Sequence, residues 1–187
     1  MARKRILTEK QAIAAAFALV REGGAEKLNS RSLAKRLGTS TQPIFTLFKT
    51  MDPIVEGVRE EAYALYESRL REALNRPEGV AKAAGVAYIG FALKEPNLFK
   101  LLFMGKPDQT RSFANSQGAA SIITSLMKEC HLDEKKAKAL YFEIGVFAHG
   151  LAVSLVTKTL AIKPEEIGRI MNGAIDGFRM HFEKKED

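Results

Sequence analysis

The three histidines and the single cysteine are the residues best suited to catalysis or metal binding, and their spacing supports neither. His131, His149 and His181 lack the short separations that metal-ligand sets share. Cys130 directly precedes His131, which is poor geometry for a nucleophile and its base. The chain contains no G-x-S-x-G, Walker or G-x-G-x-x-G motif. We therefore expect no enzyme, no catalytic residue, no metal and no cofactor.

A different chemistry, hydrogen bonding to base edges and phosphates, suits the polar side chains between residues 30 and 50. Gln42 can pair bidentately with adenine, and a threonine methyl can contact the methyl of thymine. We expect contacts to double-stranded DNA from Ser30, Arg31, Thr41, Gln42, Pro43, Thr46, Lys49 and Thr50. The alternative for any one of them is a solvated surface residue. For Lys35 and Arg36 the two interpretations remain equally open.

The positive charge of the chain is confined to its first quarter. Residues 1–50 hold ten Lys and Arg against three Asp and Glu, whereas residues 51–187 hold nineteen of each, so the formal net charge of +7 belongs to the first segment. Segregated charge indicates a polyanionic partner for one domain only. The alternative is a basic tail that aids solubility. Arg3, Lys4 and Arg5 are suited to a flexible arm that enters the minor groove.

Helical periodicity recurs along the chain without strand-like alternation, which predicts an all-α fold of about nine helices. Thr8, with Gln11 three residues later, forms the capping box of the first helix. Longer helices are expected at residues 53–75, 78–94, 110–130, 133–160 and 164–183, and a short one at residues 96–104.

Two short helices near residue 40 must position the polar side chains described above. Asn29 is the expected N-cap of the first, Gly38 ends it, and Ser40 is expected to cap the second, at residues 41–47. A tight glycine-containing turn between two short helices predicts a helix-turn-helix, in which the second helix enters the major groove.

Residues 28–48, LNSRSLAKRLGTSTQPIFTLF, resemble the DNA-binding segment of TetR-type (TetR/AcrR) repressors. The family pattern has a hydroxyl cap, an Arg, an Ile/Leu-Ala pair, Gly-Val-Ser, and an aromatic three residues before a Phe. Phe45 stands where the family usually has Tyr, and it joins the expected DNA contacts together with Arg5. The resemblance implies a DNA-binding domain at residues 1–52 and an effector-binding and dimerisation domain at residues 53–187.

Two aromatic segments of the second domain also resemble segments of these regulators, residues 88–103 and, more weakly, residues 141–152. We expect their larger side chains to line a mostly apolar cavity for a small-molecule effector. The expected ligand-binding residues are Tyr88, Phe91, Phe99, Phe103, Phe142, Glu143, Phe147 and His149. For each aromatic residue the alternative is ordinary core packing.

The helix at residues 137–156 is apolar nearly all round, so both of its sides must be covered. We expect a second subunit to cover one side in a two-fold four-helix interface. The expected interface residues are Leu151, Leu155, Ile170, Gly173, Ala174, Gly177 and Phe178. The apolar run at residues 144–156 is too short to span a bilayer, so we expect no membrane contact. A single cysteine suits a cytoplasmic location.

Together these features predict a homodimeric, ligand-responsive repressor that binds a palindromic operator. An effector would shift the helix at residues 54–75 and spoil the spacing of the two recognition helices. One alternative is an architectural or weakly specific DNA-binding protein without a ligand switch. Another is a ligand-binding helical protein whose basic segment only aids solubility.

Overall fold

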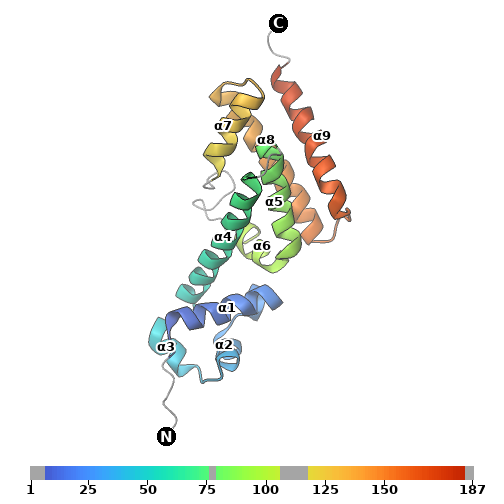
Figure 1. Ribbon diagram of the computed structural model, residues 1–187. Coiled ribbons are helices and arrows are strands. Elements are labelled where there is room, and N and C mark those ends of the chain that lie inside the picture. The colour runs from blue at the N-terminus through green and yellow to red at the C-terminus, as the bar shows by residue number, and fades with distance from the viewer. Residues whose placement is uncertain (1–6, 76–78, 106–117, 184–187) are drawn as a thin grey trace. The chain divides into compact units, whose positions relative to one another are not determined.

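The computed structural model describes residues 7–75, 79–105 and 118–183, and helices make up most of these ranges (Figure 1). No strand occurs within them, and the nine α-helices found there confirm the predicted all-α class. The elements are α1 (Glu9–Gly23), a 3₁₀ turn η1 (Ala25–Lys27), α2 (Ser30–Leu37), α3 (Gln42–Phe48), α4 (Asp52–Leu74), α5 (Val80–Lys94), α6 (Pro96–Phe103), α7 (Ala119–Glu129), α8 (Glu134–Val156) and α9 (Pro164–Glu183).

The chain forms two compact units. The first comprises Met1–Ala64 with Asn97–Gly105, and the second comprises Leu65–Pro96 with Lys106–Asp187. The long helix α4 begins at Asp52, at the domain boundary predicted from the sequence, but it contributes residues to both units. Most of α6 belongs to the first unit, although it follows α5 of the second.

Side-chain caps define the starts of α1 and α2. The Thr8 hydroxyl accepts from the Gln11 amide at 3.3 Å, and the Gln11 side chain accepts from the Thr8 amide at 3.1 Å, which confirms the predicted capping box. The Asn29 Oδ1 accepts from the amides of Arg31 and Ser32 at 3.1 and 3.0 Å. Because these bonds satisfy amides that have no partner within the helix, both helices begin where the sequence predicts.

The turn between α2 and α3 depends on Gly38. This residue is left-handed, with φ 66° and ψ 34°, and the next amide, that of Thr39, donates to the Ala34 carbonyl at 3.0 Å. The start of α3 differs from the prediction, because Thr41 rather than Ser40 is the N-cap and makes no side-chain capping bond. An N-cap residue normally has extended backbone angles, which let its side chain accept from the amides of the first turn. Thr41 has helical backbone angles instead, and its side chain makes no such bond.

The core of the first unit lies under the inner face of α1. Ala12 and Ala16 are fully buried there, and Val20 is 1% exposed. Their spacing of four residues keeps them on one side of the helix. Fully buried side chains from the other helices of the unit join them: Leu33, Ile44, Ile54 and Val58. This core holds the two short helices in place.

The second unit is built around the pair α5 and α8, against which α7 and α9 pack. Gly85 leaves room on α5 for the side chain of Met171 from α9, since a Cβ at this position would clash with the Met171 Cε. Helix α8 ends at Val156, four residues before the predicted end. The backbone turns at Lys158, with φ 60°, and the Thr159 hydroxyl donates to the Ser154 carbonyl at 3.1 Å.

Among the described residues, α8 is the one helix whose length and composition would allow it to cross a membrane. It spans 23 residues, longer than the apolar run considered in the sequence, and its most apolar 18 residues have a mean hydropathy of 1.7. One side of it is buried against the rest of the unit, through Ala137, Leu140, Ile144, Ala148, Leu151, Ala152 and Leu155. Only 28% of this apolar stretch is buried, so much of its surface is exposed in the single chain.

Candidate nucleic-acid interface and internal cavity

The two sides of α3 differ sharply. Ile44 and Phe48 point into the core, with 0% and 9% of their surface exposed. The opposite face has the spacing i, i+3, i+4, i+7 and is exposed throughout, through Gln42, Phe45, Thr46 and Lys49 at the C-terminal cap. A short helix anchored on one side by apolar residues and polar on the other has the geometry for groove binding. Phe45, at 39% exposed, adds an apolar surface to this face.

The remaining predicted DNA contacts lie at the ends of the two short helices. Arg31 and Thr50 are exposed, and Ser30, Thr41 and Pro43 are half-buried. The predicted arm of Arg3, Lys4 and Arg5 lies outside the described residues. The structure therefore brings the exposed polar residues of α3 into one outward face and places Arg31 at the N-terminal end of α2.

Arg36 and Glu22 form a bidentate ion pair between α2 and α1, with both nitrogen–oxygen distances at 2.7 Å. The hydrogen bonds hold the pKa of the Glu22 carboxyl below its usual value and raise that of the Arg36 guanidinium. This pair ties the guanidinium of Arg36 to α1. Lys35 stays exposed. The sequence left both residues open as either solvated or DNA-contacting side chains. Among the ion pairs described for this unit, one includes Arg36 and none includes Lys35.

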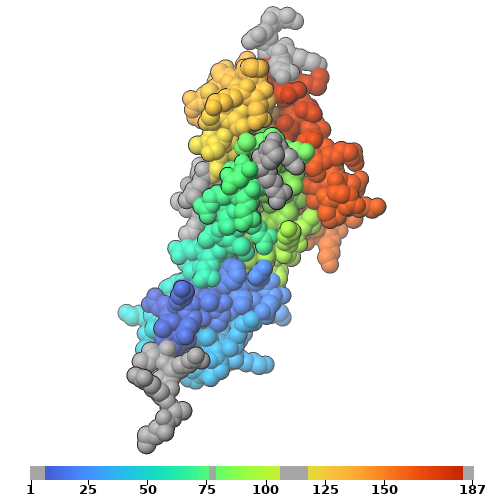
Figure 2. All heavy atoms as spheres, viewed as in Figure 1, coloured from blue at the N-terminus to red at the C-terminus, as the bar shows by residue number. Residues whose placement is uncertain are grey.

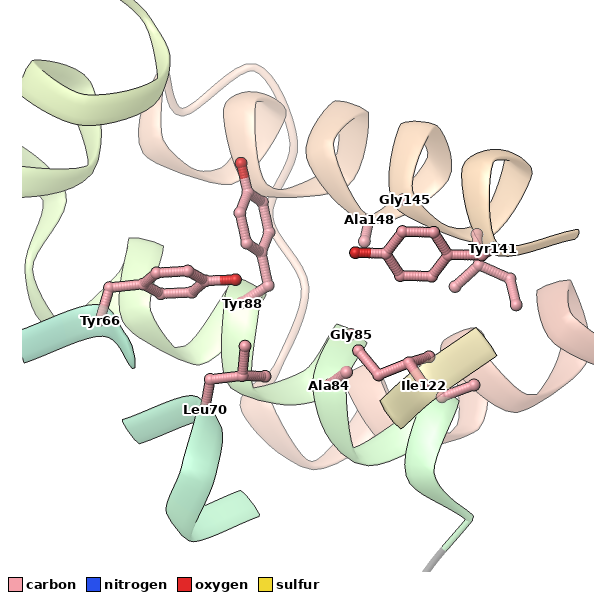
Figure 3. Close-up of a pocket in the computed structure, with 11 residues that line it drawn as sticks. Tyr66, Leu70, Ala84, Gly85, Tyr88, Ile122, Tyr141, Gly145 and Ala148 are labelled. Atoms are coloured by element: carbon pink, nitrogen blue, oxygen red, sulfur yellow. The ribbon is translucent and has the colours of Figure 1, made fainter. Parts of the chain in front are cut away.

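The second unit encloses a cavity between α4, α5, α7 and α8 (Figure 3). It is small, with about 40 Å³ available to the centres of water molecules. Its walls are Tyr66, Leu70, Ala81, Ala84, Gly85, Tyr88, Ile122, Tyr141, Ile144, Gly145 and Ala148. Neither a carboxylate nor an ammonium or guanidinium group belongs to this set. The cavity is an apolar space whose side-chain polar groups are tyrosine hydroxyls.

Tyr88 carries the best-defined polar interaction at this cavity. Its hydroxyl is 2.8 Å from the Nδ1 of His149, which is the neighbour of the wall residue Ala148. The ring of Tyr88 also meets the ring of Tyr66 edge-on, at 5.9 Å between centroids. Burial raises the pKa of the Tyr88 hydroxyl and lowers that of the His149 imidazole. Both shifts favour the uncharged forms.

The predicted ligand-binding residues are dispersed, and only Tyr88 lines the cavity. Phe91 is buried and packs on Tyr66, with the ring centroids 5.5 Å apart. Phe99 and Phe103 lie together on α6, in the first unit, with centroids 5.2 Å apart. The remaining predicted ligand-binding residues, apart from the partner of Tyr88, His149, are also on α8. Phe142 is 57% exposed there, and Glu143 and Phe147 are half-buried.

Sequence reasoning missed most of the cavity wall because it selected large aromatic residues. The wall residues of α5 have the numbers 81, 84, 85 and 88, and those of α8 have the numbers 141, 144, 145 and 148. Both sets follow the spacing i, i+3, i+4, i+7, and both contain one tyrosine and at least two small residues, with Ile144 as the remaining member on α8. This shared pattern is the signal in the sequence that marks the cavity.

A buried ion pair lies where α5 meets α6. Glu95 is 4% exposed, and its carboxylate is 2.8 Å from the Nη2 of Arg69 on α4. The guanidinium of Arg69 sits over the ring of Phe91, 5.7 Å from its centroid. Two residues after Glu95, the amide group of Asn97 donates to the backbone carbonyl of Arg21 at the end of α1, at 3.1 Å. The segment at residues 95–97 therefore makes one polar side-chain interaction within each unit, through Glu95 in the second and Asn97 in the first.

Large apolar side chains are exposed on both α8 and α9. Phe142 and Val146 of α8 are 57% and 49% exposed, and Met180 of α9 is 50% exposed. In Figure 2, α9 (red) lies at an outer edge of its unit. The predicted interface residues fall into three groups: Gly173 and Gly177 are exposed, Ile170, Ala174 and Phe178 are half-buried, and Leu151 and Leu155 are buried within the subunit.

Comparison with known proteins places these features in context. A family model described as tetracyclin repressor-like, C-terminal domain, matches residues 81–178. A TetR variant from Acinetobacter baumannii AYE, solved in complex with minocycline, has 16% identity and a TM-score of 0.60, with 97% of this chain and 99% of that chain covered. A putative transcriptional regulator from Pseudomonas aeruginosa PAO1 has 18% identity and a TM-score of 0.69, with 94% and 93% covered. No curated protein matches the chain.

Proposed function

This chain belongs to the TetR family of transcriptional regulators, and from that membership we propose that it is a cytoplasmic, homodimeric repressor that binds a palindromic operator and is released by a small-molecule effector. The observation that carries the proposal is the outward face of α3, which is polar and exposed on a helix anchored by Ile44 and Phe48. Regulators of this family are generally not enzymes.

On operator DNA, α3 lies in the major groove with Gln42 and Thr46 towards base edges. Phe45 contacts a thymine methyl or a sugar, since it is the exposed large apolar side chain on this face. Arg31, Lys49 and Thr50 contact phosphates, with Ser30, Thr41 and Pro43 beside them and Arg5 in the minor groove. Phosphate contacts fix the register of the protein, and base contacts supply the specificity.

The apolar outer surface of α8 and α9 forms the dimer interface. Phe142, Val146 and Met180 are large apolar side chains that stay about half exposed in the single subunit, and a second subunit would remove them from water. Gly173 and Gly177 allow the α9 helices of two subunits to approach closely. Packing of α8 and α9 on their symmetry mates gives a four-helix interface, in which each patch meets its own copy.

The cavity between α4, α5, α7 and α8 is the effector site. Two of its wall residues, Tyr66 and Leu70, belong to α4, the same continuous helix whose first half lies in the DNA-binding unit. An effector that widens the cavity displaces α4, and the movement is transmitted along the helix. The effector releases the operator only if it binds the displaced conformation more tightly than the DNA-binding one.

The test is a fluorescence-anisotropy titration of the purified protein against its own upstream intergenic DNA and against random DNA, across a range of salt concentrations. We expect tighter binding to one intergenic segment. In Arg31→Ala, the slope of log affinity against log salt should flatten by about 0.9 for the lost phosphate contact. Lys138→Ala is the matched control, since Lys138 is an exposed cation of the second unit paired with Glu134. Equal slopes for the two variants would contradict the assignment of Arg31.

The dimer is tested by sedimentation of Phe142→Glu, with Lys128→Glu as the control, since Lys128 is an exposed residue of α7 rather than of α8 or α9. We expect the wild type and the control to sediment as dimers and Phe142→Glu as a monomer, because a buried carboxylate without a partner opposes association. Far-UV circular dichroism checks that the monomer keeps its helices. A wild type that stays monomeric at micromolar concentration excludes the interface.

The small volume of the cavity favours one alternative, a weakly specific DNA-binding protein without a ligand switch. About 40 Å³ holds a few water molecules, so an effector has to open the site. The same titration distinguishes the two functions. Affinities for intergenic and random DNA that agree within about threefold support the alternative, because specific binding by a regulator exceeds non-specific binding by about 10³ or more.

A further inference from the structure

The outward face of α3 indicates which base pairs the chain recognises. Resting on the proposed function, we propose that α3 recognises A·T pairs, with an adenine bound by Gln42 and thymine methyl groups packed against Phe45 and Thr46. Three features of the helix carry this inference: its lack of charged side chains, the amide that Gln42 exposes, and the two apolar groups on the same face.

Helix α3 lacks the charged groups that most often read G·C pairs. Its seven residues, Gln42–Phe48, include no Lys, Arg, Asp or Glu. Specific contacts to guanine come mainly from Arg or Lys, and contacts to the amino group of cytosine come from Glu or Asp. Lys49 follows the last turn of α3, whereas the residues that contact base edges in a helix-turn-helix are near the N-terminus of the recognition helix. Lys49 is therefore suited to phosphates, and the base contacts are left to uncharged side chains.

Gln42 supplies the group that pairs with adenine. It is exposed in the first turn of α3, and its side-chain amide has no hydrogen-bond partner among the described residues. A glutamine amide offers both donors and an acceptor, and adenine presents the N7 acceptor and the N6 donor side by side in the major groove. Guanine presents two acceptors there, N7 and O6, so the amide oxygen of Gln42 would lack a donor. The bidentate match therefore favours adenine.

Phe45 and Thr46 present apolar groups beside this amide. The ring of Phe45 is 39% exposed. The hydroxyl of Thr46 donates to the Gln42 carbonyl at 2.9 Å, so its proton is used within the helix, and its methyl group can pack against a base without breaking this bond. Thymine is the base that carries a methyl group in the major groove. Contact between these groups removes apolar surface from water on both molecules.

The first experiment identifies the bases. The purified full chain selects duplexes from a library with about 30 randomised base pairs, enough for two half-sites one helical turn apart. The positions that α3 reads are those at which Gln42→Ala, Phe45→Ala or Thr46→Ser relaxes the selection. We expect A·T pairs at these positions. A G·C pair selected by the wild type at such a position overturns the proposed base preference.

The second experiment replaces thymine by uracil, one position at a time, in the selected duplex. Uracil lacks the methyl group and keeps the base-pairing groups of thymine. In fluorescence anisotropy, each contacted methyl should contribute about fourfold in affinity, as expected when one group of this size is buried. Thr46→Ser keeps the hydroxyl that bonds to the helix but loses the methyl, so it should become insensitive to one of these replacements. Equal binding of the thymine and uracil duplexes by the wild type overturns the methyl contacts.

Leu93→Ala is the matched control for Phe45→Ala. Leu93 is 38% exposed, close to the value for Phe45, but it lies on α5 in the second unit. We expect Phe45→Ala to lose sensitivity to uracil at one position and Leu93→Ala to keep the sensitivity of the wild type. Circular dichroism checks that both variants keep their helices. Full sensitivity in Phe45→Ala, or the same loss in Leu93→Ala, overturns the role of Phe45.

The outcomes separate this inference from the proposed function. If the selected duplexes share two half-sites but have G·C pairs at the positions that α3 reads, operator binding stands and the base preference is wrong. If no sequence is enriched over the starting library, sequence-specific binding fails, and the base preference fails with it.

Discussion

Substitutions at Asn29 separate the stability of α2 from its contact with DNA. The Asn29 side chain accepts hydrogen bonds from two amides of the first turn, those of Arg31 and Ser32, at 3.1 and 3.0 Å. The Ser32 hydroxyl returns a bond by accepting from the Asn29 amide at 3.1 Å. Asn29→Ala removes the first two bonds and leaves the third, which uses the backbone of residue 29.

The expected cost of Asn29→Ala is about 1 kcal/mol in the free energy of unfolding. Two bonds are lost, but Asn29 is exposed, so water replaces part of what is removed. Asn29→Gly should cost only a few tenths of a kcal/mol, because glycine leaves the amides open to water. Urea denaturation followed by circular dichroism measures both values, at one fixed protein concentration because the proposed dimer would couple stability to concentration.

Asn29→Asp keeps the two acceptor bonds and adds a negative charge that the helix N-terminus favours, so its stability should match or exceed that of the wild type. The same charge stands beside Ser30 and Arg31, which we assign to phosphate contacts. Operator affinity should therefore fall about threefold to tenfold at low salt. Stability and operator affinity that fall together in Asn29→Asp would refute this reasoning, as would Asn29→Ala with no measurable cost.

Three further substitutions test the second unit. Gly85→Ala should cost about 1 kcal/mol in urea denaturation, because its Cβ meets the terminal methyl of the fully buried Met171, which has to shift. In a Met171→Ala background, which carries a cavity cost of its own, Gly85→Ala should cost nothing further, and an equal cost of Gly85→Ala in both backgrounds would contradict this contact. Glu95→Gln should cost about 1 to 2 kcal/mol by leaving the part-buried Arg69 without its counter-charge, and stability like that of the wild type would show that the ion pair is dispensable. His149→Gln should lose less stability on acidification than the wild type does. Burial lowers the pKa of His149 in the folded state, so protonation favours the unfolded chain. The contribution of the neutral His149 to stability is therefore complete above about pH 6.5, the unfolded pKa, and is lost as the pH falls towards the folded pKa. Parallel stability profiles from pH 7.5 to pH 5 for the wild type and His149→Gln would exclude that origin.

Features of the first unit could be predicted from the sequence because short-range contacts create them. The Thr8 capping box, the Asn29 cap and the left-handed Gly38 each depend on residues within four or five positions. The position of α3 was predicted to within one residue, but its expected cap was wrong, because Thr41 rather than Ser40 is the N-cap and has helical backbone angles. The end of α8 also differed, since the backbone of Lys158 reverses direction before Leu160.

The amino-acid sequence alone determined the helical class, the basic character of residues 1–50 and the outward face of α3. Helical periodicity and helix caps depend on residues that are close in the sequence, so no knowledge of the tertiary structure is required. Only the tertiary structure decided which side chains meet at the cavity. The repeated spacing on α5 and α8 is visible in the sequence, but the angle and distance between two helices depend on the packing of both. That packing placed Tyr88 beside His149, 61 positions away, and set Phe99 and Phe103 in another unit.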